Sequence, residues 1–143
     1  MTRMWGDADS RLDWLLFARA SLVMATVVVM VRLLPYGAWR RLSLALGRVR
    51  EGADAGTAPD AIVRAVDRAS RVVPGGANCL VRALTTRRLL ARHGLSSTLV
   101  LGVAKGSACE LRAHAWLQQN GRILVGGQGG EGFLPMPDVD GRL

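Results

Sequence analysis

Cysteine and histidine, on which many nucleophilic and metal sites depend, are scarce in this sequence. Its 143 residues include two cysteines, Cys79 and Cys109, and two histidines, His93 and His114. Two cysteines are too few for a disulfide framework, so we expect reduced thiols in a cytoplasmic protein. We expect no metal site and no cofactor.

Lysine is almost absent, since Lys105 is the only one, and aromatic side chains make up 5% of the chain. The net charge of +8 therefore rests on arginine. Arginine together with abundant Ala, Gly and Val indicates a GC-rich coding sequence, but a positive charge still favours acidic partners such as nucleic acid, anionic lipid or an acidic peptide. Because aromatics are few and no nucleic-acid-binding motif is present, we expect no nucleic-acid partner.

Long hydrophobic runs are also lacking. The most apolar segment is 14–34, but its uninterrupted core spans only residues 20–31, whereas a bilayer span takes about 20 apolar residues. Near the start, Asp7, Asp9 and Asp13 lie among arginines, which does not fit a secretory signal. Three interpretations stay open: a helix in the core or against a partner, a helix on a membrane surface, and a transmembrane helix.

Apolar periodicity predicts four helices, over residues 14–34, 39–49, 57–72 and 78–93, and the third begins at either Thr57 or Pro59. Pro35 ends the first, because the residue before a proline disfavours the helical conformation. A linker rich in Gly, Ala, Asp and Pro separates the second helix from the third, and Pro74-Gly75-Gly76 separates the third from the fourth. Gly94 is the expected C-terminal cap of the fourth helix.

Four strands are expected after the helices, over residues 97–103, 110–119, 122–125 and 133–135. The second strand alternates, and Asn120-Gly121 is a strong two-residue hairpin signal. The sequence therefore predicts an α+β fold in which N-terminal helices precede a small antiparallel sheet, with the fourth helix packed on that sheet.

Cys79 stands at the expected start of the fourth helix, shortly after Gly75 and Gly76. A helix N-terminus offers unpaired backbone N–H groups and the positive end of the helix dipole, both of which stabilise a thiolate. The same N–H groups form a candidate oxyanion site. Two interpretations of Cys79 remain open: a reactive thiol and a small buried hydrophobic side chain.

His114 lies in the alternating strand, on the face whose other residues are polar or amphipathic. Cys109 has the parity of the apolar face and is expected to point into the core. His93, at a helix end, is interpreted as a capping cation. If the side chains of Cys79 and His114 meet, the protein is a cysteine hydrolase or acyl transferase; otherwise His114 is a surface histidine of a small basic domain.

Three segments in order, GGANCLVRAL, GLSSTLVLGV and AHAWLQQNGRILVGG, resemble the transglutaminase-like cysteine peptidases of lasso-peptide biosynthesis. These are stand-alone leader peptidases, and the resemblance covers about residues 62–134. It implies a transglutaminase-like or papain-like cysteine peptidase core at residues 57–143, behind an N-terminal apolar helical segment at residues 1–56.

The resemblance also implies an activity. Cys79 is the nucleophile that attacks the amide joining leader and core in a ribosomally made precursor peptide, and His114 is its general base. The implied partners are the leader region of the precursor, a separate leader-recognition protein and an ATP-dependent lasso cyclase that closes the macrolactam afterwards. Cytoplasmic location, with peripheral membrane contact by the apolar segment as an alternative, fits this role.

Peptidases of this fold generally orient the histidine with an aspartate on the next strand. A two-residue hairpin at 120–121 places His114 opposite Gly127, and residues 125–127 include no carboxylate. An orienting group fixes the imidazole tautomer and ring plane. The candidates for that role close in sequence are Gln128 and Glu131, and the alternative is a Cys–His dyad.

Three further residues are candidate site residues. Arg82, one turn after Cys79, is expected to hold substrate carbonyls or acidic leader residues, or else to be a surface arginine. Trp116 is expected either to wall the cleft beside His114 or to pack against the first helices. Asn78 is a candidate helix cap and a candidate oxyanion donor. The functional alternatives are a non-catalytic peptide-binding protein on a decayed peptidase fold and another Cys/His acyl transferase.

Overall fold

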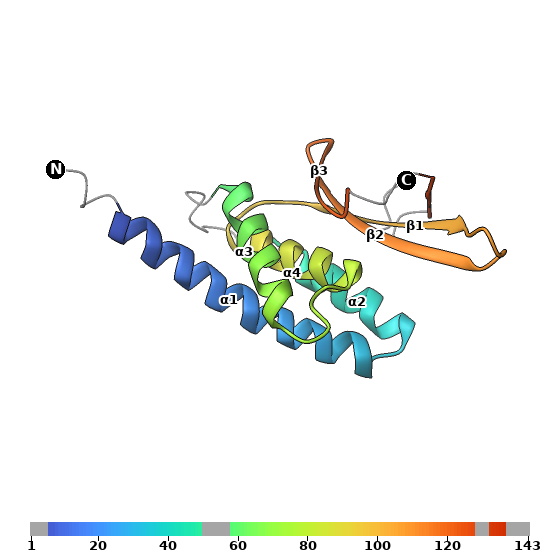
Figure 1. Cartoon of the computed structure of the whole chain (residues 1–143), viewed down its shortest axis with the longest axis horizontal. Helices are drawn as coiled ribbons and strands as arrows, with labels where there is room; N and C mark the ends of the chain where they lie inside the picture. Colours follow the sequence, from blue (N-terminus) through green and yellow to red (C-terminus); the bar gives the residue numbers. More distant parts are fainter. Residues whose placement is uncertain (1–5, 50–57, 128–131, 137–143) are drawn as a thin grey trace.

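The computed structural model describes residues 6–49, 58–127 and 132–136. Helices form one layer of the molecule, and an antiparallel sheet with strand order β3-β2-β1-β4 lies against them (Figure 1). The elements are α1 (Gly6–Leu33), α2 (Tyr36–Leu46), α3 (Pro59–Val72), α4 (Cys79–Arg92), β1 (Thr98–Lys105), β2 (Leu111–Gln119), β3 (Arg122–Val125) and β4 (Leu134–Pro135). The predicted α+β class is confirmed. The predicted boundary between residues 56 and 57 lies outside the described residues.

The longest helix, α1, begins earlier than the apolar pattern indicates and ends at Leu33, two residues before Pro35. Its stretch from Arg11 to Leu33 is long and apolar enough to cross a membrane by length and composition, and 28% of its most apolar window is buried in the structure. Core helices of soluble proteins and signal sequences also have this length and this apolar composition. Length and composition therefore do not distinguish a transmembrane helix from a packed helix.

One face of α1 packs against α3 and α4 and forms the centre of the core. The fully buried side chains there include Met24 of α1, Ile62 of α3 and Leu84 of α4. Leu99 of β1 and Leu117 of β2 join the same cluster from the sheet. Through this core, α1 packs directly against α4, the helix that carries Cys79.

A tight turn between α3 and α4 sets where α4 begins. Gly75 has a φ of +81°, a conformation that glycine adopts without steric cost. A Cβ atom on Gly76 would lie 2.6 Å from Met24 Sδ, so a side chain at this position would collide with α1. The glycines therefore let the turn press against α1 three residues before Cys79.

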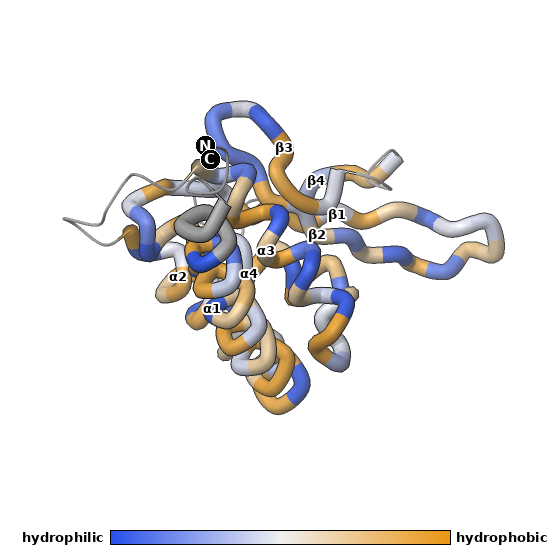
Figure 2. The backbone as a smooth tube through the Cα atoms, turned by 60° about the vertical axis from the view of Figure 1, so that its left-hand side comes forward, coloured by the Kyte–Doolittle hydropathy of each residue, from blue (hydrophilic) through white to orange (hydrophobic). Residues whose placement is uncertain are grey.

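The β1–β2 hairpin extends beyond the helical layer, as Figure 2 also shows. Its loop is held by Cys109 N donating to Gly106 O at 3.1 Å and Gly106 N donating to Glu110 O at 2.8 Å. Cys109 adopts the left-handed conformation with φ 64° and is exposed. The prediction that Cys109 points into the core is wrong, because the strand pattern was extended into a loop that no helix covers.

A β-bulge interrupts the pairing of β2 with β3. Gln119 pairs with Arg122 as the Asn-Gly signal indicates, but Leu117 pairs with Val125 instead of Leu124. The extra residue moves the Val125 side chain to the face of Leu117, where both are buried in the core. The predicted register that set His114 opposite Gly127 is therefore wrong, and β3 ends before it reaches His114.

Candidate active site

Cys79 is the first residue of α4, and its helix start is capped by its neighbour. Asn78 Oδ1 accepts a hydrogen bond from Leu80 N at 2.9 Å, which satisfies one of the unpaired donors of the first turn. Cys79 is a free, half-buried thiol. Asn78 therefore acts as the helix cap, and its oxyanion role stays a prediction.

His114 is oriented by a backbone carbonyl. Its Nε2 lies 2.7 Å from the carbonyl oxygen of Gly126. A carbonyl only accepts, so Nε2 donates this hydrogen bond, and in the neutral form of the ring Nδ1 carries the lone pair. The two predicted orienting side chains, Gln128 and Glu131, lie outside the described residues.

Two aromatic rings flank the imidazole of His114. The ring centroid of Trp116 lies 6.1 Å away with an interplanar angle of 27°, and that of Phe133 lies 5.3 Å away with an angle of 41°. Gly102, which pairs with His114 across the sheet, has no room for a side chain, since its Cβ would lie 2.6 Å from the Trp116 ring. Trp116 thus packs beside His114 but does not line the cleft described below, and its role as a cleft wall stays a prediction.

An open cleft of about 720 Å³ contains both predicted catalytic residues. Cys79 enters it from α4 and His114 from β2, and the other lining residues are Asp67, Arg71, Ala77, Arg82 and residues 123–127. Within the described residues no hydrogen bond joins the Cys79 thiol to the His114 ring. The structure brings the two groups into one cleft without closing a dyad.

The sheet edge explains how His114 reaches this cleft. Side chains alternate along β2, so Ala115 and Leu117 point to the helices while His114 and Trp116 occupy the opposite face. Among the described residues β3 ends at Val125, so no strand covers this side of β2 at His114, and His114 lines the same cleft as Cys79.

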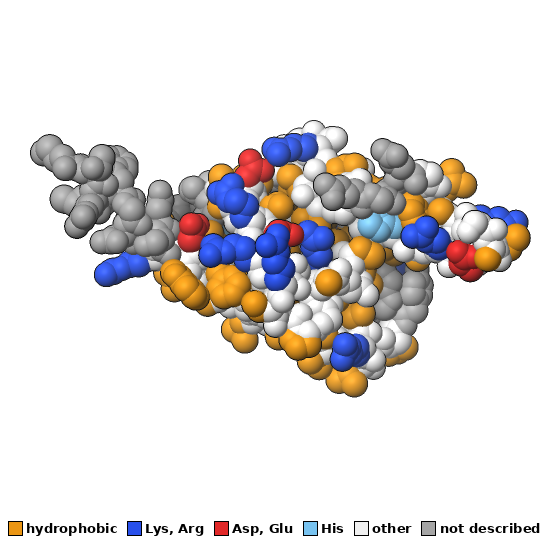
Figure 3. Space-filling model, in the orientation of Figure 1, with side chains coloured by type: hydrophobic (Ala, Val, Ile, Leu, Met, Phe, Trp, Pro, Cys, Tyr) orange, Lys and Arg blue, Asp and Glu red, His pale blue; other side chains and the backbone are white. Residues whose placement is uncertain are grey.

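Charged residues beside Cys79 form a compact network. Asp67 accepts from Arg82 at 2.9 Å and from Arg71 at 3.1 Å. The face of the molecule in Figure 3 shows such basic side chains gathered around acidic ones over the helices. Arg82 was predicted as a substrate-binding residue, whereas Asp67 and Arg71 were missed. Asp67 and Arg82 are equally distant in sequence from the turn at Pro74 and Gly75. If the two helices joined by this turn are antiparallel, the two residues lie opposite each other, and this spacing is the signal that could have found Asp67.

The edge of β2 nearest the cleft carries backbone groups without a strand partner among the described residues. The bond from Gly106 N to Glu110 O sets the alternation of the β1–β2 ladder, so Arg112 and His114 exchange their hydrogen bonds with β1. The N–H and C=O groups of Leu111 and Ala113 then point to the opposite edge. β3 pairs only with the last three residues of β2, so within residues 6–49, 58–127 and 132–136 no strand covers this edge beside His114.

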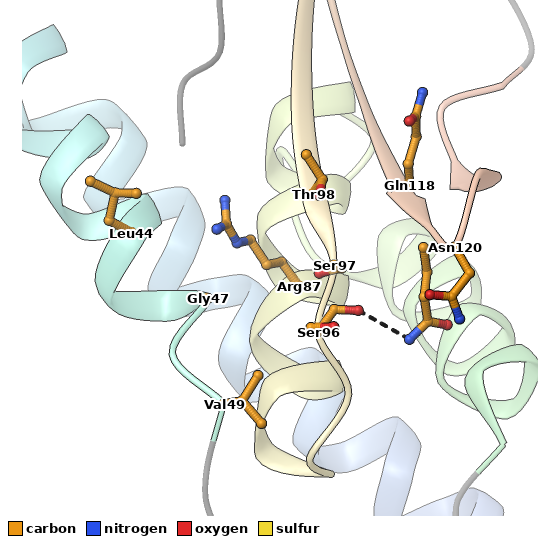
Figure 4. A pocket seen from close by; sticks show the side chains of 10 residues that line it. Leu44, Gly47, Val49, Arg87, Ser96, Ser97, Thr98, Gln118 and Asn120 are labelled. Carbon is orange, nitrogen blue, oxygen red and sulfur yellow. Dashed lines mark hydrogen bonds between the residues drawn. The ribbon is translucent and has the colours of Figure 1, made fainter. Parts of the chain in front are cut away.

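A second polar pocket, of about 420 Å³, lies at the other side of α4 (Figure 4). Arg87 is buried there and donates to Ser43 Oγ at 3.3 Å. Across the pocket, Gln119 Nε2 donates to the carbonyl of Ser96 at 3.1 Å. The lining residues include hydroxyls and amides but neither cysteine nor histidine.

The remaining histidine has a structural role. His93 Nδ1 donates to the carbonyl of Leu89 at 2.8 Å at the C-terminal end of α4, in keeping with its predicted place at a helix cap. In the part of the chain that the structure describes, no group of three His, Cys, Asp or Glu side chains is placed to hold a metal ion.

Comparison with known proteins supplies the family. The family model described as the transglutaminase-like superfamily matches residues 24–138. The chain belongs to the transglutaminase-like superfamily. Proteins with this fold are commonly cysteine hydrolases or acyltransferases, which suits a cleft that holds a thiol and an imidazole. No curated protein and no solved structure matches the chain.

Proposed function

We propose that this transglutaminase-like protein is a cysteine peptidase that removes the leader from a ribosomally made lasso-peptide precursor before macrolactam formation. The placement of Cys79 and His114 in one open cleft carries the proposal. The motifs around both residues resemble those of the lasso leader peptidases, and the superfamily commonly uses cysteine-dependent acyl chemistry.

In the proposed reaction, Cys79 Sγ attacks the carbonyl carbon of the bond between leader and core. His114 Nδ1 takes the thiol proton and delivers it to the departing core amine, which leaves the leader as a thioester on Cys79. Water then attacks the thioester while the same nitrogen takes its proton, and Cys79 regains a proton as the leader acid leaves. The thiol and the ring must first approach each other, and such bonds often tighten only when substrate binds.

The surroundings of the cleft suit an extended peptide. The open edge of β2 offers the backbone groups of Leu111 and Ala113 to a strand that would continue the line of β3. Arg82 and Arg71 provide guanidinium groups for carbonyl oxygens or acidic leader residues. A chain of this size has little surface with which to read a leader, which supports a separate leader-recognition protein and a lasso cyclase as partners in the cytoplasm.

The test is cleavage of a lasso-peptide precursor, with and without a leader-recognition protein, followed by mass spectrometry. Hydrolysis gives free leader and free core, whereas another acyl transfer gives a leader joined to a different amine. Cys79→Ala should abolish cleavage, and the matched variant Cys109→Ala, which alters the exposed loop thiol, should leave it unchanged. Cleavage that survives in Cys79→Ala would overturn the mechanism.

The non-catalytic peptide-binding protein is the second candidate, because no hydrogen bond joins the Cys79 thiol to the His114 ring in the described structure. The two candidates differ in thiol reactivity. A catalytic Cys79 reacts faster with iodoacetamide near neutral pH than the exposed Cys109, although it is the less accessible of the two. A Cys79 that reacts more slowly than Cys109, with precursor bound but uncut, supports the binding protein.

A further inference from the structure

The outer face of α1 is apolar although it is exposed. Four side chains spaced along this face are 58%, 71%, 53% and 76% exposed; we call them the outer stripe, and they are Leu15, Leu22, Val29 and Leu33. The opposite face of the same helix is buried against α3 and α4. A helix that is apolar on two opposite faces requires a second apolar neighbour, and the described part of the chain does not supply one.

The charges around the outer stripe point to the chemistry of that neighbour. Between residues 11 and 49 the sequence has six arginines and a single carboxylate, Asp13. Arg19 and Arg32 are both exposed on α1 and border the stripe. Trp14 is exposed near its N-terminal end, and tryptophan is enriched where protein meets the lipid headgroups. Arginines that flank an apolar strip complement anionic headgroups above acyl chains.

We propose that α1 binds in the plane of an anionic membrane surface through the outer stripe. The buried face of α1 holds Met24 against the turn at Gly76, so a transmembrane position would strip α3 and α4 of their packing partner. Hydrophobic side chains run along the lower edge of the molecule in Figure 3, where Figure 1 places α1. The sheet lies on the other side of the helical layer, so docking leaves the β2 edge open to a peptide.

The experiment is co-sedimentation of the purified full chain with two kinds of vesicle, phosphatidylglycerol mixed with phosphatidylcholine and phosphatidylcholine alone. The protein should bind the anionic vesicles, and added salt should weaken this binding. Leu22→Glu/Val29→Glu should lower the affinity by more than about 100-fold. The matched variant Leu111→Glu, at an exposed apolar residue of the hairpin, should bind like the wild type.

A second variant keeps the test informative if the first folds poorly. Arg19→Gln/Arg32→Gln leaves the apolar face intact and should weaken binding to anionic vesicles by about fivefold for each arginine. Equal binding to both vesicle types, or no binding to either, would overturn the proposal. So would a dimer in light scattering that Leu22→Glu/Val29→Glu dissolves without vesicle affinity, or resistance of the cellular protein to alkaline extraction, which indicates a span.

Discussion

Two polar pockets border α4, and each is lined by an arginine of that helix. The cleft at the start of α4 contains Cys79 and His114, and its Arg82 is partly exposed beside the thiol. The pocket on the other side contains hydroxyl and amide groups, and its Arg87 is buried and bonded to α2. A polar, arginine-lined hollow therefore does not identify an active site in this fold. The two pockets differ in that the first contains a thiol from α4 and an imidazole from β2, whereas the second contains neither group.

Replacing His114 of the first pocket should have the largest effect, on the rate of precursor cleavage. We expect His114→Ala to slow precursor cleavage by about 10²- to 10⁴-fold, because proton transfer to and from the thiol is lost. Single-turnover cleavage measures the rate, and thermal unfolding checks that the sheet survives. A loss smaller than tenfold in a folded variant would assign the proton transfers to another group.

Crowding the turn that positions Cys79 should have the next largest effect. Gly76→Val forces a side chain into the space of Met24, so we expect the free energy of unfolding to fall by about 1–3 kcal/mol. Gly37→Ala is the control, because a Cβ there meets no atom within 4 Å. Chemical denaturation of both variants gives the comparison, and equal stabilities would mean that the contact with α1 is unimportant.

Removing the ion pairs that hold Arg82 should have a smaller effect, on stability and on KM for the precursor. Asp67→Asn removes the charge that holds Arg82 and Arg71, and the exposure of the three side chains limits the stability loss to about 1 kcal/mol or less. If Arg82 binds substrate, KM for the precursor should rise several-fold with little change in kcat. Asp60→Asn breaks the exposed pair with Arg122 outside the cleft and should change neither constant.

A substitution in the second pocket should have the smallest effect on cleavage and on stability. Thr98→Val replaces an exposed hydroxyl of that pocket by a methyl group, and we expect cleavage and stability to stay within error of the wild type. A rate loss comparable to that of His114→Ala would move the active site to the pocket of Figure 4.

The sequence predicted the order of helices and strands because its local signals are strong. Pro35, the glycines at 75–76 and Asn120-Gly121 fix ends and turns through backbone sterics alone. It also predicted that Cys79 begins a helix, which needs only the residues around it. These features depend on neighbours in the chain.

The predictions that were wrong, and the residue that was missed, concern features that depend on packing between residues far apart in the sequence. The bulge in β3 arises because the core accepts Val125 beside Leu117, and no local pattern reports how much space the core has. Cys109 was placed by strand parity, but the helices end before they cover the hairpin. Asp67 was missed as a cleft residue because its position beside Arg82 requires knowing how α3 packs on α4.

The contact between His114 and Gly126 has a consequence for genetics. The imidazole is held by a main-chain oxygen, and a side-chain substitution at Gly126 does not delete that atom. In a scan of every position to alanine, Gly126→Ala would disturb the backbone rather than remove the acceptor, since Gly126 has a φ of +84° and a Cβ atom there would lie 2.5 Å from the Ala115 oxygen. Only a backbone edit, such as an ester placed at this peptide bond by protein semisynthesis, weakens the acceptor and reveals how much the contact contributes.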